Sequence, residues 1–197
     1  MMKEGHTCHG FHPDLMSSSR GGALGCAALV LVPFLLLAIT VAGQSQSEVK
    51  IKAAYVFNLT KYVEWPIPTN QVLVCAIGDG PQVEALRELD GKISDSRHIV
   101  VLVRPADSDL RRCDLLYVTY SSSKKIEQVV QKLSTDSVLT VGDAASFARA
   151  GGMITLLTVG DRIQIEVNLP ACQKAKLKVS SRLLSLAKIV GSERSGG

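Results

Sequence analysis

From residue 51, hydrophobic and polar residues recur with the period of an α-helix. Residues 51–66, IKAAYVFNLTKYVEWP, place Ile, Ala, Tyr, Asn, Leu, Tyr and Val at positions 51, 54, 55, 58, 59, 62 and 63, the spacing of one helix face. The stripe predicts a helix that ends before Pro66, because the residue before a proline is pushed away from helical angles. Asn58 is the polar exception on this stripe, so we expect its amide to be buried and hydrogen-bonded to a neighbouring loop or strand.

After Pro66, short apolar runs alternate with stretches of helical spacing. The pattern predicts strands at 71–78, 97–104, 113–120 and 138–143 and helices at 81–89, 121–133 and 144–152. This alternation is typical of an α/β fold with a mainly parallel sheet flanked by helices. Two β-rich runs within 153–169 then predict an antiparallel hairpin, and the apolar spacing of 177–190 predicts a C-terminal amphipathic helix.

The N-terminus has a different pattern. Residues 23–42 form a long apolar run that follows Arg20 and ends in small residues. A positive flank, an apolar stretch and a small-residue end predict a secretory signal peptide over residues 1–43, followed by one exported domain over 44–197. Because the run is long enough to span a bilayer, an uncleaved membrane anchor is the alternative.

Residues 1–15 contain a grouping that resembles a metal site, made of His6, Cys8, His9 and His12. These residues precede the charged start of the leader and would be removed with it. We interpret residues 1–15 as an over-extended reading frame whose true start is Met16. The sequence therefore predicts no metal site.

Three cysteines remain beyond the leader: Cys75, Cys113 and Cys172. Export implies an oxidising compartment, where a disulfide persists. Cys75 and Cys113 lie in apolar runs typical of buried strands, where they either pair or pack as free thiols. Cys172 is then a candidate reactive or intermolecular thiol.

Catalytic groups are scarce after the leader. His98 is the one histidine there, and its place at a strand edge favours a structural role. The sequence contains no GxSxG, HExxH, CxxC or phosphate-loop pattern, so we predict neither an enzyme nor a cofactor. The turns at Asp79 and Asp143 follow predicted strands, where α/β folds gather ligands, so a small-ligand-binding module is an alternative function.

The distribution of charge is more informative than its total. A net charge of +4 over 197 residues is too small to suggest a nucleic-acid-binding protein. Between Glu166 and Glu193 there is no acidic residue, whereas five positions are basic: Lys174, Lys176, Lys178, Arg182 and Lys188. This stretch either faces an anionic lipid or acidic partner surface, or forms the solvated side of a core helix.

Five blocks occur in order over nearly the whole exported chain: IKAAYVFNLTKYVEWP, VCAIGD, DLRRCDLLYVT, VLTVGDAASFARAGGMITL and IQIEVNLPACQKAKLKVSSRLLSLAKIV. Together they resemble the YfiR (HmsC) family of bacterial periplasmic proteins. The resemblance implies a compact α/β homodimer that inhibits an inner-membrane diguanylate cyclase of the YfiN type by engaging its periplasmic sensor region. Such a regulator lowers cyclic-di-GMP and biofilm formation, and it meets the membrane only through its partner or an uncleaved leader.

The resemblance also implies site residues. Cys75 and Cys113 fall at the positions of one family disulfide, whereas the second family pair, near Ala145–Gly152, has no cysteine in this chain. The partner contacts of the family correspond to Glu166, Asn168, Lys174 and Lys178, with Arg182 adjacent. The alternative is that Glu166 and Asn168 only close the hairpin and cap the helix.

Overall fold

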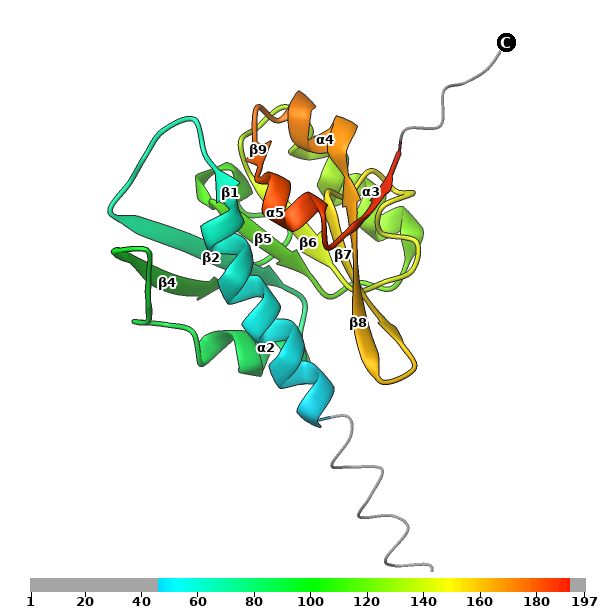
Figure 1. Ribbon diagram of the computed structural model, residues 1–197, viewed down its shortest axis with the longest axis horizontal. Coiled ribbons are helices and arrows are strands. Elements are labelled where there is room, and N and C mark those ends of the chain that lie inside the picture. Colours follow the sequence, from blue (N-terminus) through cyan, green and yellow to red (C-terminus); the bar gives the residue numbers. More distant parts are fainter. Residues whose placement is uncertain (1–45, 192–197) are drawn as a thin grey trace, which may run out of the picture. The chain divides into compact units, whose positions relative to one another are not determined.

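The structure is a computed structural model that describes residues 46–191 (Figure 1). The expected signal peptide and the grouping of histidines and Cys8 lie outside the described residues. Within residues 46–191, no helix combines the length and the apolar character that a membrane crossing requires.

The described chain starts with a helix over residues 46–62, which confirms the helix predicted from the first apolar stripe. The elements that follow are β1 (Val63–Glu64), β2 (Gln71–Ile77), α2 (Pro81–Arg87), β3 (Ile93–Ser94), β4 (Arg97–Val103), the 3-10 helix η1 (Leu110–Arg112), β5 (Leu115–Val118), α3 (Ser123–Lys132), β6 (Leu139–Gly142), β7 (Ile154–Val159), β8 (Arg162–Asn168), α4 (Leu169–Lys174), β9 (Lys178–Val179), α5 (Ser181–Leu184) and β10 (Lys188–Val190).

Eight strands form one sheet in the order β10-β8-β7-β6-β5-β2-β4-β3. The five central strands β7, β6, β5, β2 and β4 run parallel to one another. β7 and β8 form the predicted antiparallel hairpin, β3 is antiparallel to β4, and β10 is parallel to β8. The mainly parallel α/β sheet is therefore confirmed.

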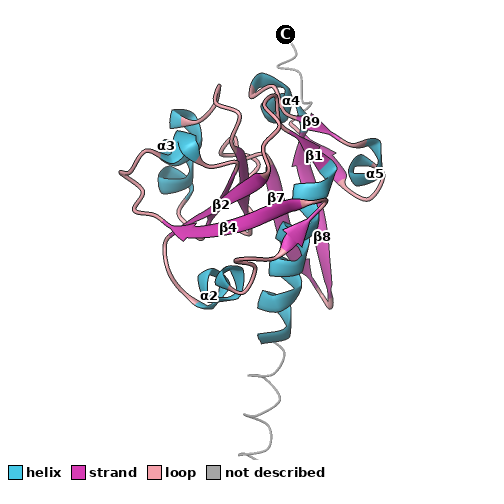
Figure 2. Ribbon diagram, turned by 90° about the vertical axis from the view of Figure 1, so that its left-hand side faces the viewer, coloured by secondary structure: helices cyan, strands magenta, loops and turns pink. Residues whose placement is uncertain are grey.

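Helices cover both faces of this sheet, as Figure 2 shows for α3 on one side and α5 on the other. Alternate strand residues supply the two cores, because successive side chains of a strand point to opposite faces. Val74 and Leu115 pack with the N-terminal helix and α2 on one face. Their neighbours Cys75 and Leu116 pack with α3 and η1 on the other.

The N-terminal helix buries a different face from the one predicted. Asn58 is exposed, so the prediction of a buried amide at this position is wrong. Ala53 and Val56 are buried instead, together with the polar residues Lys52 and Thr60. These two polar side chains find partners inside the protein, such as the Ser94 hydroxyl at 2.7 Å from Thr60 Oγ1. The prediction considered only the apolar residues of the helix, so it gave the wrong orientation for a helix that also buries two polar side chains.

The segment 144–152 forms successive turns, so the helix predicted there is wrong. Phe147 is fully buried and anchors these turns. Gly142 and Gly152 lie against its ring, where a Cβ atom on either glycine would collide with the aromatic carbons. The packing of one ring between two glycines thus fixes a compact turn that helical spacing does not reveal.

The C-terminal amphipathic helix predicted over 177–190 is also wrong. The segment is divided into β9, the single-turn helix α5 and β10. β9 pairs antiparallel with β1, Ser180 Oγ accepts a hydrogen bond from Leu183 N to start α5, and β10 extends the sheet beside β8. These backbone partners come from distant parts of the chain and outweigh the local helical pattern.

Candidate interaction surface

The five residues predicted to contact a partner come from four consecutive elements. Glu166 and Asn168 lie on β8, Lys174 ends α4, Lys178 lies on β9 and Arg182 lies in α5. The three cations are exposed. In contrast, Glu166 and Asn168 are each only 8% exposed, so each needs partners within the protein.

Glu166 is held by a lysine of the neighbouring strand. Its Oε1 accepts hydrogen bonds from Lys188 Nζ at 3.1 Å and from Gln164 Nε2 at 3.3 Å. Glu166 and Lys188 are directly opposite each other in the β8–β10 pairing, so the parallel register creates this contact. The sequence did not predict the Glu166–Lys188 pair, because its apolar spacing assigned Lys188 to the solvent-facing side of a helix over residues 177–190.

Asn168 joins three segments. Its Oδ1 accepts a hydrogen bond from Ala171 N at 3.2 Å and so caps α4, and its Nδ2 donates to the Ala148 carbonyl oxygen at 3.2 Å. Asparagine is among the best N-cap residues and contributes about 1 kcal/mol in such a position. The capping role expected as the alternative for Asn168 is therefore present, and the same amide also holds the 144–152 turns.

Lys174 and Asn168 come together at a cavity of about 420 Å³ between α3, the 144–152 turns and α4. Lys178 and Arg182 are not among its lining residues. Lys178 instead lies opposite Glu64 in the β1–β9 pairing, and Arg182 follows in the first turn of α5. The structure thus places Asn168 and Lys174 at the cavity and Lys178 and Arg182 on the exposed β9–α5 segment. Glu166 lies apart from both, paired with Lys188.

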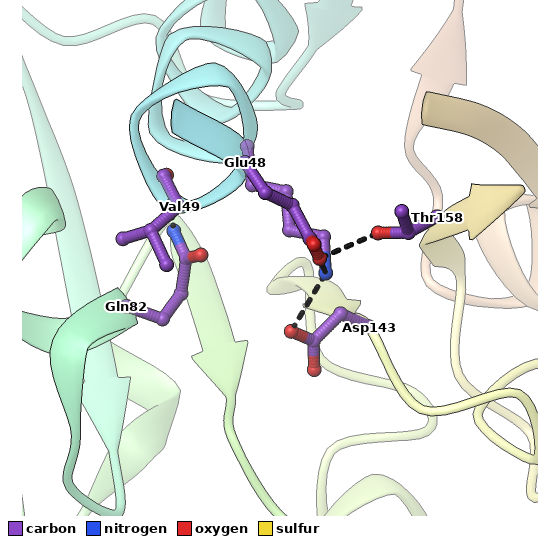
Figure 3. A network of polar contacts seen from close by, with 6 residues as sticks. Glu48, Val49, Gln82, Asp143 and Thr158 are labelled. Atoms are coloured by element: carbon purple, nitrogen blue, oxygen red, sulfur yellow. Dashed lines mark hydrogen bonds and ion pairs between the residues drawn. The ribbon is translucent and has the colours of Figure 1, made fainter. Parts of the chain in front are cut away.

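A second polar cluster attaches the start of the N-terminal helix to the sheet (Figure 3). Lys52 Nζ lies 2.7 Å from Glu48 Oε1 and 3.2 Å from Asp143 Oδ2, and the lysine side chain is only 8% exposed. Thr158 of β7 donates a hydrogen bond to Glu48, and Gln82 of α2 donates to the Val49 carbonyl oxygen. The hydrogen bond from Lys52 is the largest influence that lowers the pKa of Glu48.

Asp143 therefore belongs to this cluster and does not line an open cleft. Asp79, the other turn residue considered for ligand binding, is exposed at the surface. Nearby, the hydroxyl of Tyr117 is buried without a hydrogen-bond partner among the described residues. Burial raises the pKa of Tyr117, and the negative charge of Asp143 raises it further. Tyr117 is consequently a neutral member of the core.

A family model described as YfiR/HmsC-like matches residues 49–188. The chain belongs to the YfiR/HmsC-like family. A comparison with curated proteins found no match. The matched range of this YfiR/HmsC-like chain starts within the N-terminal helix and ends in β10, so it includes the whole candidate surface. The family is regulatory and not catalytic.

The disulfide implied by the resemblance to this family is formed in the structure. Cys75 of β2 and Cys113 after η1 are bonded, with their Cα atoms 5.9 Å apart. Both cysteines belong to the core between the sheet and α3. The bond thus ties the loop before β5 to the neighbouring strand β2.

Cys172 of this YfiR/HmsC-like domain is a free thiol inside the core. It is fully buried in the first turns of α4, and burial raises its pKa to about 12. A nucleophilic cysteine needs an accessible thiolate. The structure therefore contradicts the expectation that Cys172 is a reactive or intermolecular thiol.

The remaining candidate groups of the family member are dispersed. His98 is exposed on β4. Among residues 46–191, no three or more histidine, cysteine, aspartate or glutamate side chains come together in a way that would hold a metal ion.

Proposed function

We propose that this protein is a periplasmic regulator that binds the periplasmic sensor region of a membrane-bound, YfiN-like diguanylate cyclase and holds the cyclase inactive. The result is less cyclic-di-GMP and less biofilm. The observation that carries this proposal is the match of the YfiR/HmsC-like family to residues 49–188. The lack of known catalytic motifs in the sequence agrees with a regulator that acts by binding.

The charges of the candidate surface support an acidic partner. Lys174, Lys178 and Arg182 are exposed on consecutive elements, and no acidic residue lies between Glu166 and Glu193 in the sequence. Complementary charge accelerates the encounter of two proteins and selects the correct partner. The buried Glu166 and Asn168 act differently, because Glu166 holds β10 through Lys188 and Asn168 caps α4, the helix that carries Lys174.

The proposal includes export and self-association. The N-terminal leader directs the domain to the periplasm, where the Cys75–Cys113 disulfide persists. The protein acts as a homodimer and meets the membrane only through the cyclase or an uncleaved leader. Neither a nucleic acid nor a cofactor takes part.

A pull-down tests both the function and the surface. The full chain, tagged at its C-terminus and expressed in its source cells, is recovered from solubilised membranes, beside a Lys174→Glu/Lys178→Glu variant. Lys132→Glu is the control, because Lys132 is an exposed lysine at the end of α3 that lines a different hollow, beside residues 106–111, and not the cavity with Lys174. We expect the wild type and the control to recover a cyclase with a GGDEF domain, and the double variant to lose it.

Each result of this experiment has a separate meaning. Recovery of the cyclase by all three proteins keeps the function and removes Lys174 and Lys178 from the surface. Recovery by none contradicts the proposed partner and favours a ligand-binding module without a cyclase. Deletion of the gene gives an independent measurement, because loss of an inhibitor must raise cellular cyclic-di-GMP.

A further inference from the structure

The cavity between α3, the 144–152 turns and α4 has the composition of a small-molecule site. Its volume of about 420 Å³ lies within the range usual for ligand pockets. Val130, Ala150, Met153 and Pro170 give it an apolar lining. Gly151 adds a wall without a side chain, where its positive φ of 93° disfavours any larger residue.

Two buried polar residues also line this cavity. Thr140 is 1% exposed, and its Oγ1 accepts a hydrogen bond from Met153 N at 3.1 Å. Its hydroxyl hydrogen has no acceptor among residues 46–191. Asn168 uses one amide hydrogen for the Ala148 carbonyl oxygen, and the second has no acceptor in the described part of the chain. Buried donors without acceptors are costly, so both residues favour a ligand that brings acceptor oxygens.

The rim of the cavity carries a net positive charge of one. Arg149 and Lys174 are exposed cations that form no ion pair with another described residue, and Glu127 is the one acidic residue of the lining. Gln131 Nε2 donates to Glu127 Oε1 at 3.1 Å, which holds the carboxylate on α3. This balance favours a ligand with a single negative charge over a doubly charged phosphate.

We propose that this cavity binds a small organic monocarboxylate, with the carboxylate at Arg149 and Lys174 and a compact apolar body against Val130 and Met153. The buried donors of Thr140 and Asn168 then add hydrogen bonds to the oxygens of this same carboxylate. The two cations and the two buried donors together favour an organic acid over a purely apolar molecule.

Ligand binding has a consequence that rests on the proposed function. Lys174 would then serve both the ligand and the cyclase, and Asn168 lines the cavity while it caps α4. An organic acid in the cavity neutralises Lys174 and so weakens the attraction to an acidic partner. The ligand therefore releases the cyclase.

Phenylacetate is the probe, and phenylacetamide is the uncharged control of the same shape. The protein is purified from cells that express the full chain, and binding is followed by NMR at the backbone amides of Gly151, Met153 and Asn168. A probe of this size should bind with a dissociation constant of about 1 mM. Arg149→Gln and Lys174→Gln should each weaken binding about threefold, as expected for exposed charges.

Lys132→Gln is the control variant, because it removes an exposed lysine of α3 that does not line this cavity. We expect its affinity for phenylacetate to equal that of the wild type. Unchanged thermal midpoints of the three variants show that the differences come from binding.

Three results would overturn the ligand proposal: no shift of these amides at about ten times the expected constant, equal affinities for phenylacetate and phenylacetamide, or equal or tighter binding of inorganic phosphate. The pull-down with added phenylacetate then tests the regulatory consequence. Cyclase that stays bound to a ligand-saturated protein contradicts the regulation alone, whereas failure to recover cyclase without ligand contradicts the proposed function.

Discussion

Replacement of Lys52 by methionine should destabilise the protein by about 2 kcal/mol. Loss of one partner from a fully buried ion pair costs about 3–5 kcal/mol, whereas exposed pairs contribute about 0–1 kcal/mol. Lys52 is 8% exposed, but the side chains of Glu48 and Asp143 are 37% and 29% exposed, so water screens the two carboxylates that remain. The estimate therefore lies between the two limits.

Urea unfolding followed by the fluorescence of Trp65, the single tryptophan of the chain, measures this change. Lys50→Met is the matched control, because Lys50 is an exposed lysine of the same helix and its loss should change stability by less than about 0.5 kcal/mol. Asp143→Asn completes a double-mutant cycle. The double variant should be more stable than the sum of the single changes predicts, because the two side chains interact directly.

The effect of Lys52→Met should also depend on pH. The folded protein holds the pKa of Glu48 below its ordinary value of 4.5, so its contribution is present above that value and is lost as the pH falls through the folded pKa. The difference between wild type and Lys52→Met should therefore be full at pH 7 and shrink as the pH falls below 4.5 toward the lowered pKa of Glu48. Equal stabilities of Lys52→Met and Lys50→Met at pH 7 would refute the reasoning.

Three further predictions concern the cores. Reduction or Cys75→Ala/Cys113→Ala should cost about 4 kcal/mol on the chain-entropy model for a separation of 38 residues, measured by urea unfolding; a loss below 1 kcal/mol would contradict it. Gly152→Ala should destabilise by about 1–3 kcal/mol because its Cβ meets the Phe147 ring, and an unchanged thermal midpoint would count against this packing. Cys172 should resist alkylation until the protein unfolds, since its pKa is raised to about 12; rapid modification of the native protein at pH 8 would disprove its burial.

Local patterns in the sequence determined the existence and type of most central elements. Short apolar runs predicted β2, β4, β5 and β6, and their alternation with helical stretches predicted the parallel sheet. The hairpin of β7 and β8 followed from two β-rich runs around one turn. The central strands β5 and β6 are buried on both faces and β2 nearly so, and this burial leaves a direct mark on composition.

The candidate surface was only partly predictable. The resemblance to the family supplied Glu166, Asn168, Lys174, Lys178 and Arg182. Burial in the structure separates the two β8 residues, which position neighbouring elements, from the three exposed cations. The pairing of Glu166 with Lys188 depends on a strand register across 22 residues, for which local periodicity contains no signal.

The tertiary structure alone decided the orientation of the N-terminal helix and the course of residues 177–190. The helix turned Lys52 and Thr60 inward because Asp143 and Ser94, distant in the sequence, offer them partners. The C-terminal residues became β9, α5 and β10 because β1 and β8 offered unpaired backbone groups. The sequence by itself thus determined the central sheet from local burial. Long-range hydrogen bonds and ion pairs decided the rest, because an unpaired polar group inside a protein costs more than a local helical preference contributes.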